Sequence, residues 1–238
     1  CKKYIMKRIY KFILCVSLAF TLFSYGATAK GKYVTIDGKN LVQPNGKKLF
    51  IIGTNLGNWL NPEGYMFGFK KTNSYWMINH AICQMVGPDT ADEFWSKFKD
   101  NYVTRRDIDY LASLGANTIR LPFNYKLFTD EDFMGLSVNQ DGFARVDSLV
   151  SWCRDNHLYL ILDMHDAPGG QTGDNIDDSY GYPWLLESEK SQSKFCDVWR
   201  KIADRYKDEP VILGYELLNE PIAPYFENMK DLNTKLEP

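Results

Sequence analysis

The chain has 238 residues, of which 45% are hydrophobic and 15% aromatic, enough to build a sizeable core in one or two domains. Its 28 basic and 30 acidic residues are mixed along the sequence and give a net charge of −2, so neither a basic patch for nucleic acid nor an acidic tail for a cationic partner is present. Aromatic richness with balanced charge suits a protein whose ligand is neutral and stacks on rings, such as a sugar.

The N-terminal segment has the three parts of a secretory signal peptide. Met6-Lys7-Arg8 begins a cationic segment, Phe12 to Phe23 is mostly apolar, and Ala27-Thr28-Ala29 is a small-x-small cleavage pattern. The apolar stretch is too short to span a bilayer. A membrane anchor or a buried helix is the alternative interpretation.

We therefore expect residues 6–29 to be a signal peptide. The chain opens on Cys1 rather than on Met, so residues 1–5 are expected to be translated residues upstream of the true start at Met6. The mature protein, residues 30–238, is expected to be secreted, periplasmic or extracellular, without a stable membrane anchor.

Three cysteines remain after that segment, namely Cys83, Cys153 and Cys196. An odd number cannot all pair within one chain, and their spacings match no zinc or redox motif. Cys153 and Cys196 lie in apolar helical patterns, which predicts two small core residues. A disulfide between them is the alternative in an exported protein.

The segment that follows begins with turn signals and then alternates between helical and strand-like patterns. Two turn signals, Asp37-Gly38 and Asn45-Gly46, predict a small hairpin over 32–48. The predicted strands are Leu49–Gly53, Ala116–Leu121 (halted by Pro122), Leu158–Leu162 and Val211–Leu217. The predicted helices are 92–114 (stopped by Gly115), 146–156, 190–206 and one more after Pro221.

Strands that alternate with amphipathic helices predict right-handed βαβ units and a parallel sheet. No low-complexity or Pro/Gly-rich linker divides residues 30–238, so we expect one domain. Four strands are roughly half of the eight that a closed (β/α)₈ TIM barrel needs. A doubly wound sheet is the alternative, although no Gly-x-Gly-x-x-Gly supports its nucleotide-binding form.

Polar residues stand at the carboxyl ends of these strands, where parallel sheets carry their chemistry. Arg120 ends the second strand, His165 follows the third, and Asn219 and Glu220 follow the fourth. Each has a simpler interpretation: a structural ion pair for Arg120, a core or metal-binding histidine for His165, and a helix cap for Asn219 and Glu220. Only three histidines are present, which argues against a zinc site. Strand alternation predicts that Asp163 points away from the other groups and is structural.

Aromatic residues lie in the loops between these elements. Trp59 and Trp184 follow strands in Gly/Asn-rich loops, where an exposed ring would stack on a sugar; the alternative for both is a core position. The aromatic loop Tyr65–Met77 is expected either to form a cleft wall or to pack down over the mouth of the barrel.

Four ordered motifs at successive strand ends resemble those of glycoside hydrolase family 5, the cellulase family of (β/α)₈ glycosidases. The first turn, together with Asp166-Ala167-Pro168-Gly169-Gly170-Gln171, is most similar to members that act on β-glucans, including exo-acting ones. The resemblance runs from about Lys32 to the C-terminus. The motifs are Gly53-Thr54-Asn55-Leu56-Gly57-Asn58-Trp59, Asn117-Thr118-Ile119-Arg120-Leu121-Pro122, Asp163-Met164-His165 and Leu218-Asn219-Glu220-Pro221.

The resemblance implies a secreted retaining glycoside hydrolase that cleaves β-glucosidic bonds of glucans. Glu220 matches the general acid/base, which protonates the leaving oxygen and then deprotonates water. Asn219 matches the residue that holds the sugar 2-hydroxyl at the cleaved bond. Arg120 matches an arginine beneath the nucleophile, which it keeps ionised, and His165 matches a histidine that orients the substrate or the nucleophile. Retention implies two carboxyl groups about 5–5.5 Å apart.

The sequence departs from the family at the nucleophile, a second glutamate at the end of the seventh strand, which has no match here. We expect residues 30–238 to be the N-terminal part of the catalytic domain, truncated in its fourth helix and inactive alone. A β-glucan polysaccharide or oligosaccharide is the expected partner, with no nucleic acid, and the full-length protein is expected to be a monomer. Hydrolysis by two carboxylates needs neither a metal nor an organic cofactor, so none is expected.

Two other functions stay open. A non-catalytic carbohydrate-binding protein could keep the same scaffold, and a relative could act on mannan or xylan instead of glucan. Linkage preference and endo or exo action are open as well.

Overall fold

The computed structural model describes residues 31–136, 141–173, 177 and 182–221, which form two compact units that divide after Phe50. The expected signal peptide and the expected helix after Pro221 lie outside the described residues. No helix within the described ranges is long and apolar enough to cross a membrane.

The first unit carries a three-stranded antiparallel sheet, in the order β1-β2-β3. Its strands are β1 (Thr35–Asp37), β2 (Asn40–Val42) and β3 (Lys48–Leu49). The predicted turns lie between them, and both of their glycines take the left-handed backbone, with φ of 59° at Gly38 and 84° at Gly46. The predicted hairpin is therefore confirmed.

The second unit is built on a parallel sheet of four strands whose spatial order follows the chain. This confirms the predicted parallel sheet. The strands are β4 (Gly53–Asn55), β5 (Thr118–Asn124), β6 (Tyr159–Asp166) and β7 (Ile212–Glu216).

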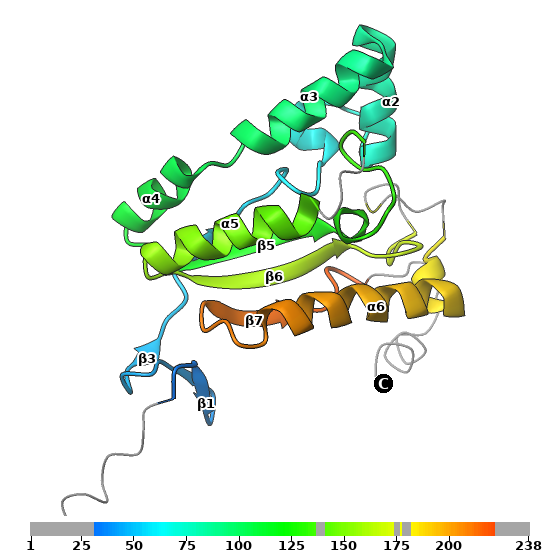
Figure 1. Cartoon of the computed structure of the whole chain (residues 1–238). Coiled ribbons are helices and arrows are strands. Elements are labelled where there is room, and N and C mark those ends of the chain that lie inside the picture. Colours follow the sequence, from blue (N-terminus) through cyan, green and yellow to red (C-terminus); the bar gives the residue numbers. More distant parts are fainter. Residues whose placement is uncertain (1–30, 137–140, 174–176, 178–181, 222–238) are drawn as a thin grey trace, which may run out of the picture. The chain divides into compact units, whose positions relative to one another are not determined.

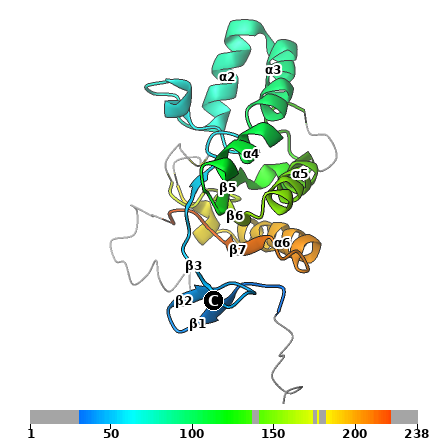
Figure 2. The ribbon, with the colours of Figure 1, turned by 90° about the vertical axis from the view of Figure 1, so that its left-hand side faces the viewer.

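Helices cover one face of this sheet. Figures 1 and 2 show α4, α5 and α6 on the same side of β5, β6 and β7, while α2 and α3 form a separate helical hairpin. The helices are α2 (Tyr75–Val86), α3 (Pro88–Asn101), α4 (Arg105–Ser113), α5 (Asp141–Asp155) and α6 (Glu189–Tyr206), with short 3₁₀ turns η1 (Gly64–Phe67), η2 (Tyr125–Phe128) and η4 (Trp184–Leu186).

The core fills the space between the sheet and these helices. On β5 the alternate residues Ile119, Leu121 and Phe123 are fully buried, and the Phe123 ring meets Trp199 of α6 edge-on at 5.8 Å. The intervening residues of β5 therefore face the opposite side of the sheet. Arg120 is one of them, and this face carries the polar groups described below.

Several predicted elements differ in their limits. The expected helix 92–114 is two helices, because Thr104 and Asp107 form a capping box that starts α4 anew. The last residues of the expected loop Tyr65–Met77 are helical, because Ser74 caps the first turn of α2, which begins at Tyr75. Cys153 is buried as predicted, whereas Cys196 is exposed and both are free thiols, so no disulfide joins them.

Strand β5 runs through Pro122 instead of halting there. The N–H groups of Thr118 and Asn124 bond to carbonyls on the β4 side, at Ile52 and Leu60. Pro122 is an even number of residues from both, so its backbone nitrogen faces the β4 side as well. Strand β4 has already ended at Asn55, before it could pair with Pro122. The missing proline N–H therefore costs no ladder bond.

The first predicted core strand, Leu49–Gly53, is wrong in its position. Leu49 belongs to β3, and the side chains of Phe50, Ile51 and Ile52 are 74%, 52% and 59% exposed. Strand β4 begins only at Gly53, where an added Cβ would lie 1.8 Å from the carbonyl oxygen of Thr118. The close approach of β4 to β5 thus requires glycine.

Gly53→Ala is expected to destabilise the chain by about 1–3 kcal/mol, because β4 must move away from β5 to admit the methyl group. Gly214→Ala is the matched control: Gly214 also lies in a parallel strand, and its added Cβ would have no neighbour within 4 Å. That control should stay within about 0.5 kcal/mol of the parent. Urea unfolding measures both, and equal losses in the two variants would contradict the packing account.

Candidate active site

A cluster of polar side chains lies on the face of the sheet opposite the helices, centred on the guanidinium of Arg120. Its Nε donates to Oε2 of Glu216 at 2.6 Å, and its Nη2 donates to Oε1 of Glu216 at 2.7 Å and to Oδ1 of Asn219 at 3.0 Å. Nη2 also lies 2.9 Å from Oδ2 of Asp163. Strands β5, β6 and β7 therefore meet at one cation.

Glu216 is a member of this cluster that sequence reasoning missed. The forked pairing with Arg120 is the main cause that holds the pKa of Glu216 below its ordinary value of 4.5. A signal was present in the sequence: a carboxylate inside an apolar strand run must find a donor. Arg120 is the cation within the neighbouring strands that could supply one.

The position predicted for Asp163 is wrong. Its side chain is fully buried and lies against both Arg120 and His165, so it does not point away from the site. Side chains two apart on a strand share a face, which places Asp163 on the side of His165. Burial raises the pKa of Asp163, and the hydrogen bond from His165 opposes that rise.

His165 and Asn219 are brought together as the sequence predicts. Nδ1 of His165 is 2.8 Å from Oδ2 of Asp163, and its Nε2 is 3.4 Å from Nδ2 of Asn219. The backbone N–H of Asn219 donates to the carbonyl of Met164, which ties the end of β7 to β6.

Gln171 fastens the loop after β6 to the same edge, a role that sequence reasoning did not assign. Its side chain is buried, and Nε2 donates to the carbonyl of His165 at 2.6 Å and to that of Asn219 at 3.0 Å. Its Oε1 accepts the backbone N–H of Ala167. The amide thereby joins the residues that follow two strands.

A second carboxylate missed from the sequence, Glu63, faces this cluster from the loop after β4. Its Oε1 is 4.0 Å from Nε2 of His165. Burial is the main cause that raises the pKa of Glu63; His165 lowers it and the nearby Glu220 raises it. The backbone N–H of Glu63 donates to Oδ1 of Asn58. The backbone of Asn58 is itself left-handed, with a φ of 65°.

Glu220 lies at the end of this edge with an exposed side chain. Its φ of 40° is in the left-handed region, which non-glycine residues seldom adopt and which recurs at functional sites. Glu220 follows Asn219 directly and lies close enough to influence the titration of both Glu63 and Arg120.

The two tryptophans predicted to stack on sugars differ from one another. The prediction for Trp59 is wrong: its ring is 1% exposed, and Nε1 donates to the carbonyl of Lys99 in α3, so it is a core residue. Trp184 is 47% exposed and lies against the ring of Tyr182 at 4.8 Å. Its backbone N–H donates to the carbonyl of Gly169, in the loop that carries Gln171.

The aromatic segment Tyr65–Met77 is divided between buried and exposed rings, and its expected role as a cleft wall or as a cover over the mouth of the barrel stays a prediction. Phe67 and Phe69 pack on the core, while the side chains of Tyr65 and Trp76 are 67% and 64% exposed.

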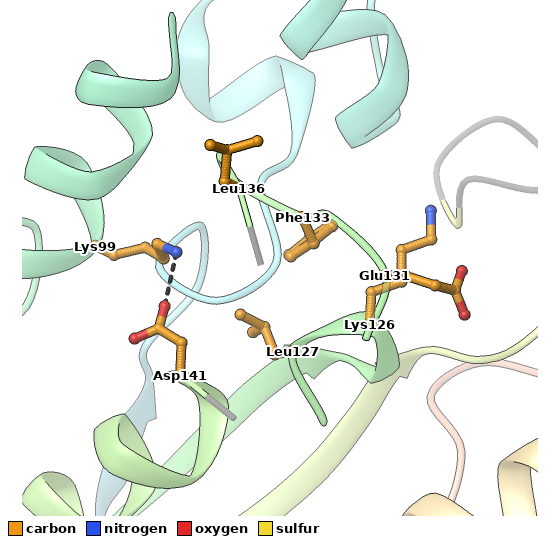
Figure 3. Close-up of a pocket in the computed structure, with 7 residues that line it drawn as sticks. All are labelled: Lys99, Lys126, Leu127, Glu131, Phe133, Leu136 and Asp141. Atoms are coloured by element: carbon orange, nitrogen blue, oxygen red, sulfur yellow. Dashed lines mark hydrogen bonds and ion pairs between the residues drawn. The ribbon is translucent and has the colours of Figure 1, made fainter. Parts of the chain in front are cut away.

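A small cavity beside the sheet lies apart from this cluster. Figure 3 shows its lining, in which Nζ of Lys99 points at Asp141 and pairs with it at 2.7 Å. Its volume of about 10 Å³ admits about one water molecule, too little for a sugar. None of the predicted site residues lines it. Among the described residues, no group of three or more His, Cys, Asp or Glu side chains could hold a metal ion.

Comparison with known proteins shows the family to which the chain belongs. Residues 71–235 match the family described as Cellulase (glycosyl hydrolase family 5). The chain belongs to glycosyl hydrolase family 5. The match includes the strand-end residues Arg120, His165, Asn219 and Glu220.

Individual relatives in the family differ in their substrates. A β-xylosidase from Phanerodontia chrysosporium is 33% identical over 194 residues, which cover 81% of this chain and 40% of the relative. Glucan 1,3-β-glucosidase I/II from Saccharomyces cerevisiae is 29% identical over 223 residues, which cover 88% of this chain and 48% of the relative. This chain thus spans less than half the length of both.

Solved structures share the fold. Rutinosidase from Aspergillus niger aligns with a TM-score of 0.58 at 23% identity, over 71% of this chain and 48% of that one. The four parallel strands and their helices are accordingly β/α units of a (β/α)₈ barrel, as the sequence predicts.

Glu216→Gln is expected to destabilise the family 5 chain by about 1 kcal/mol at neutral pH, because Arg120 loses a charged partner that is partly screened by solvent. The folded-state pKa of Glu216 is lowered, so this contribution is present above the ordinary value of 4.5 and is lost as the pH falls through the lower folded value. Urea unfolding at a series of pH values measures the difference.

Glu93→Gln is the matched control, since Glu93 pairs with Lys97 on the surface and both side chains are over 70% exposed. It should change stability little at any pH. A Glu216→Gln deficit that persists unchanged in acid would show that the ion pair is not its source.

Proposed function

We propose that this chain is part of a retaining glycoside hydrolase that cleaves β-glucosidic bonds of glucans. Glu220 is the general acid/base, and Asn219 holds the 2-hydroxyl of the sugar at the cleaved bond. The single observation that carries the proposal is the convergence of Arg120, His165, Asn219 and Glu220 on one edge of a parallel sheet in a family 5 chain.

The surroundings of Glu220 suit an acid/base that must take up and release a proton. It is exposed, so a substrate and water can reach it. A second carboxylate, Glu63, lies nearby, and its pKa is raised mainly by burial and further by the charge of Glu220. The exposed pair of Trp184 and Tyr182 offers rings on which a sugar could stack.

The nucleophile is proposed to come from sequence outside the described residues. Glu216 is engaged on both oxygens by Arg120, and Asp163 is fully buried, so neither can attack a sugar carbon. Arg120 would hold the incoming carboxylate ionised as it does Glu216. The protein is further proposed to be exported by the segment 6–29.

The glucan preference draws on the names of the relatives. The family is described as cellulases, and one relative is a glucan 1,3-β-glucosidase. The β-xylosidase relative keeps a xylan-directed activity as the second candidate. Product analysis on β-1,3-, β-1,4- and mixed-linkage glucans and on xylan separates the two.

Glu220→Gln is expected to lower the hydrolysis of soluble β-glucan about 10²–10⁴-fold in the protein extended to the length of its relatives, because proton transfer to the leaving oxygen is lost. The assay follows reducing-end release, with Glu93→Gln as the control that should keep full activity. Residues 30–238 alone should release no sugar.

The stereochemistry of the first product provides an independent measurement, since a retaining enzyme yields the β-anomer first. Hydrolysis that survives Glu220→Gln would exclude Glu220 as the acid/base. Binding of glucan without any turnover by the extended protein would favour a carbohydrate-binding function instead.

A further inference from the structure

Asp163 is a buried carboxylate to which the proposed mechanism assigns no role, yet it contacts both side chains that hold Asn219. Its Oδ2 is 2.8 Å from Nδ1 of His165 and 2.9 Å from Nη2 of Arg120. Asn219 in turn lies 3.0 Å from that same Nη2 and 3.4 Å from Nε2 of His165. The four side chains form a closed ring of polar contacts.

Hydrogen-bond chemistry permits one arrangement of protons around this ring when the imidazole is neutral. A guanidinium only donates, so the amide atom of Asn219 that faces Arg120 is the oxygen. The amide nitrogen then faces His165, and because it also donates, Nε2 of the ring must accept. The ring proton is therefore on Nδ1, where Asp163 accepts it.

We propose that Asp163 is a positioning residue that fixes the Nδ1–H form of His165 and, through His165 and Arg120, the orientation of the Asn219 amide. One Nδ2–H of Asn219 is used by His165, which leaves the second for a ligand. That the ligand is the sugar 2-hydroxyl rests on the proposed function; the proton arrangement does not.

The neighbours of His165 make the alternative form accessible when Asp163 is lost. With a proton on Nε2, the ring would point a donor toward Oε1 of Glu63, 4.0 Å away, and would also oppose the Nδ2 group of Asn219. Removing the acceptor at Nδ1 therefore releases the ring to turn its proton toward Glu63. An Nε2–H would favour the amide oxygen of Asn219 as its acceptor. If the amide flipped to supply that oxygen, Nδ2 of Asn219 would face Nη2 of Arg120, and two donors would meet.

Two substitutions separate the role of Asp163 as the hydrogen-bond acceptor for Nδ1 of His165 from the role of its negative charge. Asp163→Leu has a similar size and offers no acceptor at Nδ1. Asp163→Asn keeps an acceptor, because the amide oxygen must occupy the place of Oδ2: an amide nitrogen there would face the Nη2 of Arg120 at 2.9 Å. Its nitrogen would take the place of Oδ1, which has no hydrogen-bond partner among the described residues.

The experiment is the ¹H–¹⁵N correlation of the imidazole rings in the ¹⁵N-labelled 238-residue chain, at a pH about two units above the ordinary histidine pKa of ~6.5. The chain has only three histidines, and His165→Gln identifies the signal. His165 should carry its proton on Nδ1 in the parent and in Asp163→Asn, and should shift to Nε2 in Asp163→Leu. Asp141→Asn, which removes the charged partner of the buried Lys99, is the control that should leave the signal unchanged.

An Nε2–H signal from His165 in the parent chain would overturn the proposal, and so would an Nδ1–H signal that persists in folded Asp163→Leu. If Asp163→Leu does not fold, the test rests on the parent chain and Asp163→Asn. An Nε2–H signal from His165 in Asp163→Asn would contradict the acceptor role of residue 163. No turnover is measured. The result therefore stands apart from the success or failure of the glucan hydrolysis assay.

Discussion

The site depends on one ionic contact, in which Nε and Nη2 of the Arg120 guanidinium bond to the two carboxylate oxygens of Glu216. Asp163 and Asn219 contact the same Nη2. A half-buried cation in the middle of a sheet is costly unless it is surrounded by acceptors. Its acceptors come from β6, from β7 and from the residues that follow β7. The neutralisation of a single charge thus also aligns the carboxyl ends of three strands.

The parallel sheet makes this contact unavoidable once the residues are in place. Asp163 and Glu216 are paired across β6 and β7, and side chains of one parity share the face opposite the helices. The loops then build outward from that fixed edge. Gln171 ties the loop after β6 to Asn219, and the close approach at Gly53 delivers the loop that carries Glu63. Glu220 is held at the rim by its fixed neighbour Asn219.

The parts of the fold and site that could be predicted from the sequence are those that follow from the spacing of apolar residues and from the order of the strands. Strands β5, β6 and β7, helices α5 and α6, and the meeting of Arg120, His165 and Asn219 all depend on such patterns. The parts it missed depend on the course of loops. Trp59 is buried because a carbonyl forty positions away in α3 receives its N–H, and Glu63 reaches His165 by a path that no periodicity encodes.

Hydrogen exchange at the backbone amide of Asn219, which donates to Met164, tests the organising role of Arg120 most directly. Arg120→Lys keeps the charge and loses the planar fork. The account predicts about tenfold faster exchange at Asn219 in this variant, the equivalent of one lost charged hydrogen bond. The amide of Asn124, which donates to Leu60 at the same edge, should change much less. Unchanged exchange at Asn219, or an equal rise at both amides, would contradict it.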